Sequence, residues 1–224
     1  MKHKHALYPI FMSICAFLCF IVVVILMTDT VQPLWGRTML LLLPAVILGS
    51  VGLLSLNGKL SMNKTVILTT ILTIVLLLAS MFYFFLLTIW TATTETTDIR
   101  YYSRAYDQIE DEDGVENVFP RRIPDDAENI DFSYTPQFLQ GGEVFELSYT
   151  TTVEKLAEWS ARLTGEADWI GSNKEWLEAH NRIFSGKDST RYLLYWDGGS
   201  NHGEMCYVLI DEEISRITFY YSEW

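Results

Sequence analysis

The second part of this sequence has few basic residues, and the first part has three long stretches with no charged residue. Residues 92–224 hold 11 Lys and Arg against 27 Asp and Glu, whereas residues 1–91 hold five Lys and Arg against one acid. The acidic excess argues against nucleic acid as a partner, because binding phosphates needs a basic surface. The separation of apolar and acidic parts excludes a wholly soluble protein. It predicts a transmembrane region over 1–91.

Cysteine is also scarce. Cys206 is the only cysteine beyond residue 91, so the acidic part contains no partner for an intramolecular disulfide. We interpret Cys206 as a buried thiol on a strand, because a reactive thiolate needs an electropositive environment. Cys15 and Cys19 follow Ile14 and Leu18, whereas a lipidation site would need a small residue there. We interpret both as apolar side chains one helical turn apart.

Motifs of known catalytic chemistry are missing. The sequence has no G-x-S-x-G elbow, no H-E-x-x-H zinc pair, no Walker loop and no G-x-G-x-x-G fingerprint. The three uncharged stretches also lack His, which argues against a self-sufficient transporter, because ionisable groups within a membrane usually serve transport. We therefore name no catalytic, metal-binding or cofactor-binding residue, expect no cofactor, and favour a protein that is not an enzyme.

Each uncharged stretch is long enough to cross a membrane. Pro9–Met27 and Thr38–Leu56 have 19 residues each, and Thr65–Trp90 has 26. At about 1.5 Å per helical residue, each spans roughly the 30 Å hydrocarbon layer. A spanning segment must satisfy its own backbone hydrogen bonds, so we predict three transmembrane helices in contact with the lipid bilayer.

The basic residues of the first part predict an orientation. Lys2 and Lys4 precede the first span, and Lys59 and Lys64 lie between the second and third spans. The loop between the first two spans has only Arg37. Because basic residues concentrate on the cytoplasmic side, we expect a multi-pass protein of the cell membrane with a cytoplasmic N-terminus and an extracytoplasmic C-terminal domain.

Several residues of the spans invite a structural interpretation. Ala45 and Gly49 form a small-xxx-small pair that permits close helix contact, and the neighbouring Pro44 predicts a kink. For Tyr83 and Trp90 two interpretations stay open. They lie either at the outer membrane interface or in helix packing.

Residues 92–114 are predicted to form a linker and a short amphipathic helix. The Thr-rich start is typical of an exit from the membrane into water. Four residues then recur at helical spacing: Ile99, Tyr102, Tyr106 and Ile109. We expect this helix to end near Gly114 and to extend the third span outward as a stalk.

Residues 115–224 are predicted to form an acidic α+β domain. Alternation over 130–134 and 145–149 around Gly141 and Gly142 predicts a β-hairpin. Strand-like runs at Arg191–Trp196, Met205–Ile210 and Ile214–Tyr221 predict an antiparallel meander. In the middle run both faces are apolar, which is typical of a central strand covered on both sides.

Two helices are expected between the hairpin and the meander. Thr151 with Glu154 resembles a capping box, followed by a helix that buries Val153, Leu156, Ala157 and Leu163 and stops at Gly165. Ser172 with Glu175 resembles a second capping box, which predicts a second helix that ends at Gly186. The element order ββααβββ predicts a two-layer α+β domain with a mostly antiparallel sheet.

Acidic groups are the first candidates for a binding site. In Glu110–Gly114 only Asp111 and Asp113 fit an EF-hand, so that motif fails; a looser calcium site and a solvated loop stay open. A second group follows, which we expect Arg121 and Arg122 to neutralise in part. Its members are Asp125, Asp126, Glu128 and Asp131.

Histidine and tryptophan are the other candidates. We interpret His180 as a core histidine on the apolar face of a helix and His202 as part of a hairpin turn, rather than as catalytic bases. Five tryptophans either line a groove for sugar or peptide or fill the core, and we favour the core. They are Trp159, Trp169, Trp176, Trp196 and Trp224.

The segment 119–150 carries a resemblance. Phe119-Pro120-Arg121-Arg122-Ile123-Pro124, Phe132-Ser133-Tyr134 and Phe138-Leu139-Gln140-Gly141-Gly142 resemble segments in small membrane-anchored proteins of Gram-positive bacteria with no assigned activity. The resemblance implies no catalytic residues. It is compatible with a cell that has one membrane, where the exterior is the wall side.

We therefore expect a multi-pass membrane protein that displays an extracytoplasmic α+β domain for binding or as an accessory module. One alternative is a membrane-tethered cell-wall hydrolase, which needs two acids at a fixed separation in a cleft. The other is an accessory subunit of a transporter or sensor, with another membrane protein as its partner.

Overall fold

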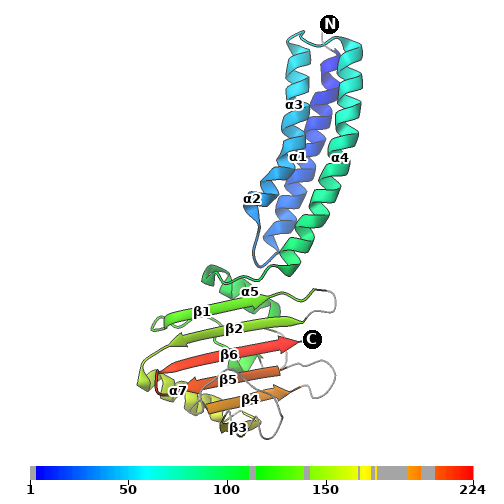
Figure 1. Ribbon diagram of the computed structural model, residues 1–224. Coiled ribbons are helices and arrows are strands. Elements are labelled where there is room, and N and C mark those ends of the chain that lie inside the picture. The colour runs from blue at the N-terminus through cyan, green and yellow to red at the C-terminus, as the bar shows by residue number, and fades with distance from the viewer. Residues whose placement is uncertain are drawn as a thin grey trace. The chain divides into compact units, whose positions relative to one another are not determined.

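The computed structural model describes residues 4–110, 115–138, 142–165, 167–172, 175, 191–197 and 205–223. The chain forms two compact units, Met1–Ala92 and Thr93–Trp224. The first is helical, and the second contains a β-sheet with helices (Figure 1).

Long apolar helices make up the first unit. They are η1 (Lys4–Ala6) with α1 (Leu7–Thr28), then α2 (Trp35–Thr38), η2 (Met39–Leu42) and α3 (Leu43–Leu56), then α4 (Met62–Thr93). Three continuous helical segments, Lys4–Thr28, Trp35–Leu56 and Met62–Thr93, are long and apolar enough to cross a membrane. Each predicted span lies inside one of them.

The second of these segments changes geometry where a kink was predicted. η2 is a 3-10 helix that ends at Leu42, and α3 begins at Leu43 with Pro44 in its first turn. Pro44 has no backbone N–H, so it cannot donate to the carbonyl of Leu40 as an α-helix would require. The tighter 3-10 helix η2 covers the residues where this α-helical hydrogen bond is missing.

Small residues let α1 and α3 approach each other closely. Ser13 Oγ donates a hydrogen bond to the carbonyl of Ala45 at 2.7 Å. A Cβ atom on Gly49 would lie 3.1 Å from Ser13 Oγ, and one on Gly52 would lie 2.7 Å from Ile10 Cγ1. The Ala45 and Gly49 pair therefore serves a contact within the chain.

One antiparallel sheet forms the centre of the second unit. Its strands are β1 (Glu128–Thr135), β2 (Glu143–Thr150), β3 (Trp169–Ser172), β4 (Arg191–Asp197), β5 (Met205–Asp211) and β6 (Arg216–Glu223). The spatial order is β1-β2-β6-β5-β4-β3, so the predicted hairpin and the predicted meander join through β2 and β6. β5 lies between β6 and β4 inside the sheet, and this position explains why all residues of Met205–Ile210 are buried.

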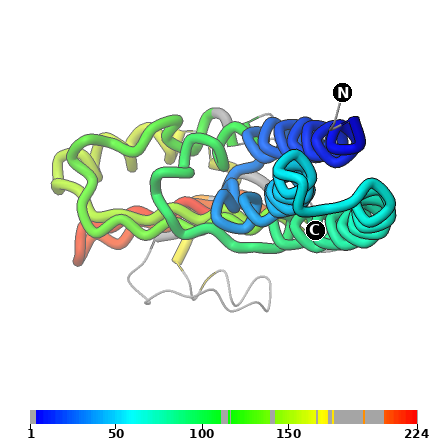
Figure 2. The backbone as a smooth tube through the Cα atoms, turned by 90° about the horizontal axis from the view of Figure 1, so that it is seen from above, coloured from blue at the N-terminus to red at the C-terminus, as the bar shows by residue number. Residues whose placement is uncertain are grey.

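Helices cover one face of this sheet. α5 (Tyr102–Ile109) follows the 3-10 turn η3 (Ile99–Tyr101), and α6 (Val115–Val118) and α7 (Val153–Thr164) complete the described helices. The ring of Tyr102 contacts Phe132 and Phe145, and Trp159 contacts Phe219. The register puts these three phenylalanines on the same face, so α5 and α7 share one side of the sheet, as Figure 2 shows.

The core lies between these helices and the sheet. Phe145 is fully buried, and its ring contacts those of Tyr102, Phe119, Phe132 and Tyr134. Aromatic pairs at such distances add to the free energy gained by burial. The helix assigned to the linker is thus part of the core of the domain.

The expectation for the segment after the third span is corrected. α4 ends at Thr93, and Thr96 pairs with Tyr134 of β1 through two backbone hydrogen bonds of 2.9 Å. The predicted stalk is therefore wrong, because the chain leaves the helix and joins the edge of the sheet. α6 was also not predicted.

The start of α7 differs from the prediction by one residue. Thr152, not Thr151, is the N-cap, and its hydroxyl accepts from the backbone N–H of Lys155 at 3.3 Å. The hydroxyl of Thr151 instead donates to Asp126 at 2.6 Å. Of the four expected core residues, Leu156 and Leu163 are buried, whereas Val153 and Ala157 are exposed.

Candidate functional site

The second face of the sheet has an apolar half and a polar half. On the apolar half, Met205, Tyr207 and Leu209 of β5 are buried, and Trp169 and Tyr220 pack against them. The rings of Tyr207 and Tyr220 stack at 4.6 Å between centroids. Trp169 thereby contributes to packing, as we favoured.

An ion pair dominates the polar half, on β1, β2 and β6. Nη2 of Arg216 donates to Asp131 Oδ2 and to Ser148 Oγ, both at 2.5 Å. Arg216 is largely buried while Asp131 is mostly exposed. The arrangement orients one guanidinium on the sheet and leaves a carboxylate in water, where an ion pair contributes little to stability.

Glu146 lies on the same face of β2 as Ser148 and is half-buried. Burial raises the pKa of its carboxyl, the neighbouring Arg216 opposes this rise, and Asp131 and Glu95 add to it. A carboxyl with a raised pKa is suited to proton transfer, but it needs a second reacting group. Among the described residues of this face, Glu146 has no nucleophile with an adjacent base beside it.

The described members of the acidic groups found in the sequence form separate local contacts. Glu110 forms an ion pair with Arg121, and residues 111–114 lie outside the described residues. Asp126 accepts from Thr151, which lowers the pKa of its carboxyl. Arg121 was expected to neutralise the group that includes Asp131, but the described partner of Asp131 is Arg216. Across the described ranges, no three His, Cys, Asp or Glu residues are grouped to hold a metal ion.

The remaining candidates are partly described. Trp159 contacts Phe219 and also lies under the guanidinium of Arg162 at 4.0 Å, so it fills space between α7 and the sheet. His180, His202, Trp176, Trp224 and the side chain of Trp196 lie outside the described residues. Ser172 and Glu175 form the predicted reciprocal cap, with Ser172 N donating to Glu175 Oε2 at 2.7 Å. The helix expected beyond Glu175 also lies outside.

Cys206 is fully buried on β5, as predicted. Burial raises the pKa of its thiol to about 12. The thiolate, which is the nucleophile, is therefore scarce at neutral pH.

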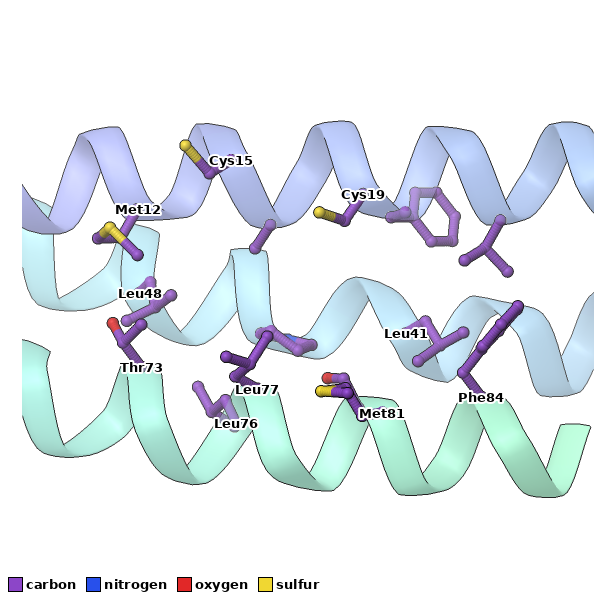
Figure 3. Close-up of a pocket in the computed structure, with 15 residues that line it drawn as sticks. Met12, Cys15, Cys19, Leu41, Leu48, Thr73, Leu76, Leu77, Met81 and Phe84 are labelled. Atoms are coloured by element: carbon purple, nitrogen blue, oxygen red, sulfur yellow. The ribbon is translucent and has the colours of Figure 1, made fainter.

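The first unit contains a groove that sequence reasoning missed. Side chains of α1, of the η2–α3 segment and of α4 line it, and Figure 3 shows Cys19, Leu41 and Phe84 facing one another across it. The cavity volume is about 300 Å³, at the lower end of the range of ligand pockets. The lining is almost wholly apolar and partly open to the surroundings.

Arg37, Tyr83 and Trp90 form a cluster near one end of this groove. The guanidinium carbon of Arg37 lies 4.5 Å from the ring centroid of Trp90, within the range of a cation–π contact. The Tyr83 hydroxyl donates to the carbonyl of Arg37 at 3.0 Å, and its ring meets that of Trp90 edge-on. The two aromatic residues therefore hold the start of the second helix against α4.

No signal in the sequence alone shows the groove, because its lining comes from three segments distant in sequence. Each contributes residues at three- and four-residue spacing, such as Cys15 and Cys19, which also fits ordinary helix packing. No family model matches the chain, and no curated protein or solved structure matches it.

Proposed function

We propose that the chain is a multi-pass protein of the cell membrane that displays an extracytoplasmic α+β domain as a binding or accessory module. One observation carries this proposal. Three helices long and apolar enough to cross a membrane are followed by a separate compact unit, which contains the strongly acidic part of the chain.

The charge distribution of the helical unit supports the orientation. Lys4, Lys59 and Lys64 lie at the ends of helices that meet at one end of the unit, where the α3–α4 loop and η1 are placed. Arg37 lies at the other end, between α1 and α3. By the preference of basic residues for the cytoplasm, the first end is cytoplasmic and the domain after α4 lies outside.

A binding role is supported by the second face of the sheet. It offers the half-buried Tyr220, which stacks on the buried Tyr207, beside the Arg216 ion pair. A partly exposed aromatic ring beside an oriented charge suits recognition of a polar partner.

Sidedness is tested by labelling introduced cysteines in intact cells, in a chain whose Cys15, Cys19 and Cys206 are replaced by alanine. Asp125→Cys places a thiol at an exposed position of the domain, and Lys59→Cys places one in the α3–α4 loop. A maleimide that cannot cross the membrane is expected to label Asp125→Cys in intact cells and Lys59→Cys only after lysis. Labelling of Asp125→Cys only after lysis overturns the proposal.

A further inference from the structure

We propose that the groove of the helical unit binds one acyl chain of a phospholipid, whose phosphate pairs with Arg37. This inference rests on the membrane location proposed above. It does not depend on which side of the membrane Arg37 faces.

The chemistry of the groove selects the occupant. Leu48, Leu77, Phe84 and the other groove residues are apolar or weakly polar, and the helices are embedded along their length if the spans cross a bilayer. At this depth the surrounding phase is hydrocarbon, so water is a poor occupant. A partly open apolar groove in that phase fits a flexible hydrocarbon chain.

The length of the groove matches one leaflet. On α4 its lining extends from Thr73 to Phe84, 11 residues apart. At about 1.5 Å per residue this is roughly 16 Å, close to half of the roughly 30 Å hydrocarbon layer. A lipid chain whose head lies at the membrane surface extends over such a distance, whereas a transmembrane helix of a partner would need the full thickness.

Arg37 provides the charge at the appropriate end. It lies four residues before Leu41, which lines the groove, and Tyr83 lies next to Phe84. Among the described residues no carboxylate forms an ion pair with Arg37, and its guanidinium is held over Trp90. The planar fork of arginine suits phosphate oxygens better than a point charge does.

Native mass spectrometry of the full chain in mild detergent tests both parts of the proposal. The probes are phosphatidylglycerol, the diacylglycerol with the same acyl chains, and glycerol 3-phosphate. We expect tightest binding of phosphatidylglycerol, weaker binding of diacylglycerol, and none of glycerol 3-phosphate. Equal binding of the two lipids overturns the role of the phosphate. Binding of glycerol 3-phosphate alone overturns the role of the chain.

Variants separate the head from the groove. Arg37→Gln is expected to weaken phosphatidylglycerol binding about tenfold without changing diacylglycerol binding, the size of one lost charged contact. Lys59→Gln, the same change at the other end of the unit, should have no effect. An unchanged affinity in Arg37→Gln contradicts the proposal.

Filling the groove tests the chain. Ala16→Phe and Ser80→Phe place a ring in it from two different helices and should abolish binding of both lipids. Ala79→Phe makes the matched change at an exposed position of α4 that does not line the groove. Thermal melting confirms that each variant folds. Lipid binding retained by a folded Ala16→Phe or Ser80→Phe variant contradicts the proposal. A dimer that forms without bound lipid also contradicts it.

The labelling experiment in cells is independent of these results, so failure of the proposed location is distinguished from failure of lipid binding.

Discussion

Gly52 of α3 lies so close to Ile10 of α1 that a Cβ atom on Gly52 would meet Ile10 Cγ1 at 2.7 Å. Real Cβ atoms do not approach other atoms so closely, so a larger residue must displace the Ile10 side chain or push α1 away from α3. The same two helices share the hydrogen bond from Ser13 to Ala45. Glycine here is required by close approach of two helices rather than by a turn.

We predict that Gly52→Ala destabilises the helical unit. Overpacking typically costs about 1–3 kcal/mol, which exceeds the roughly 0.5–1 kcal/mol that alanine gains over glycine in a helix. The thermal unfolding midpoint in detergent should fall. Gly36→Ala is the control, because nothing lies within 4 Å of a Cβ there. Equal midpoints for Gly52→Ala and the unmodified chain contradict the described helix contact.

We predict that Phe145→Ala strongly destabilises the α+β domain. Phe145 is fully buried among four aromatic rings, and removal of such a side chain typically costs about 3–5 kcal/mol. Urea unfolding followed by tryptophan fluorescence measures the loss. Ile214→Ala, at a side chain that is 48% exposed, should change stability by less than about 0.5 kcal/mol.

The N-cap of α7 provides a prediction about the hydroxyl of Thr152. Thr152→Ala removes the acceptor for Lys155 N–H and should cost about 1 kcal/mol, whereas Thr152→Ser should retain most of the stability. Comparison of urea midpoints checks this. If Thr152→Ser is as destabilised as Thr152→Ala, the hydroxyl is not the stabilising group.

The sequence predicted those elements whose residues repeat a local pattern. Alternation around Phe132 and Phe145 predicted the hairpin, and the apolar run Met205–Ile210 predicted a strand covered on both faces. By contrast, β3 is only four residues long and contains Gly171, so it has too little pattern to be recognised.

Tertiary contacts account for the other differences. Thr151 and Thr152 are equally good caps by composition, and the bond from Thr151 to Asp126, 25 residues earlier, leaves Thr152 as the cap. The groove and the Arg37 cluster likewise depend on how three helices pack together. No spacing along one helix contains that information.

Cys206 is predicted to be unreactive in the folded protein. Its burial and raised thiol pKa leave almost no accessible thiolate at pH 7.5. A maleimide should modify it only after urea unfolding, and peptide mass spectrometry distinguishes it from Cys15 and Cys19. Rapid modification of Cys206 in the native protein contradicts its placement in the core.

Glu146 is predicted to make the stability of the domain depend on pH. Burial holds the pKa of its carboxyl above the ordinary value, against the opposing effect of Arg216. The stability that this group contributes is therefore fully present below its unfolded-state pKa, and it is lost as pH rises through the folded-state pKa. Glu146→Gln carries no charge at any pH in this range, so it avoids that loss.

Urea midpoints across a pH series measure the effect of Glu146→Gln. Relative to the unmodified chain, this variant should gain stability as the pH rises from the ordinary range of a glutamate carboxyl toward neutrality. Comparing the two proteins at each pH cancels the titration of every other group they share. Glu128→Gln removes the same charge at an exposed position of β1 and is the matched control for the substitution itself. A difference that does not change with pH for Glu146→Gln would show that burial does not raise the pKa of the Glu146 carboxyl.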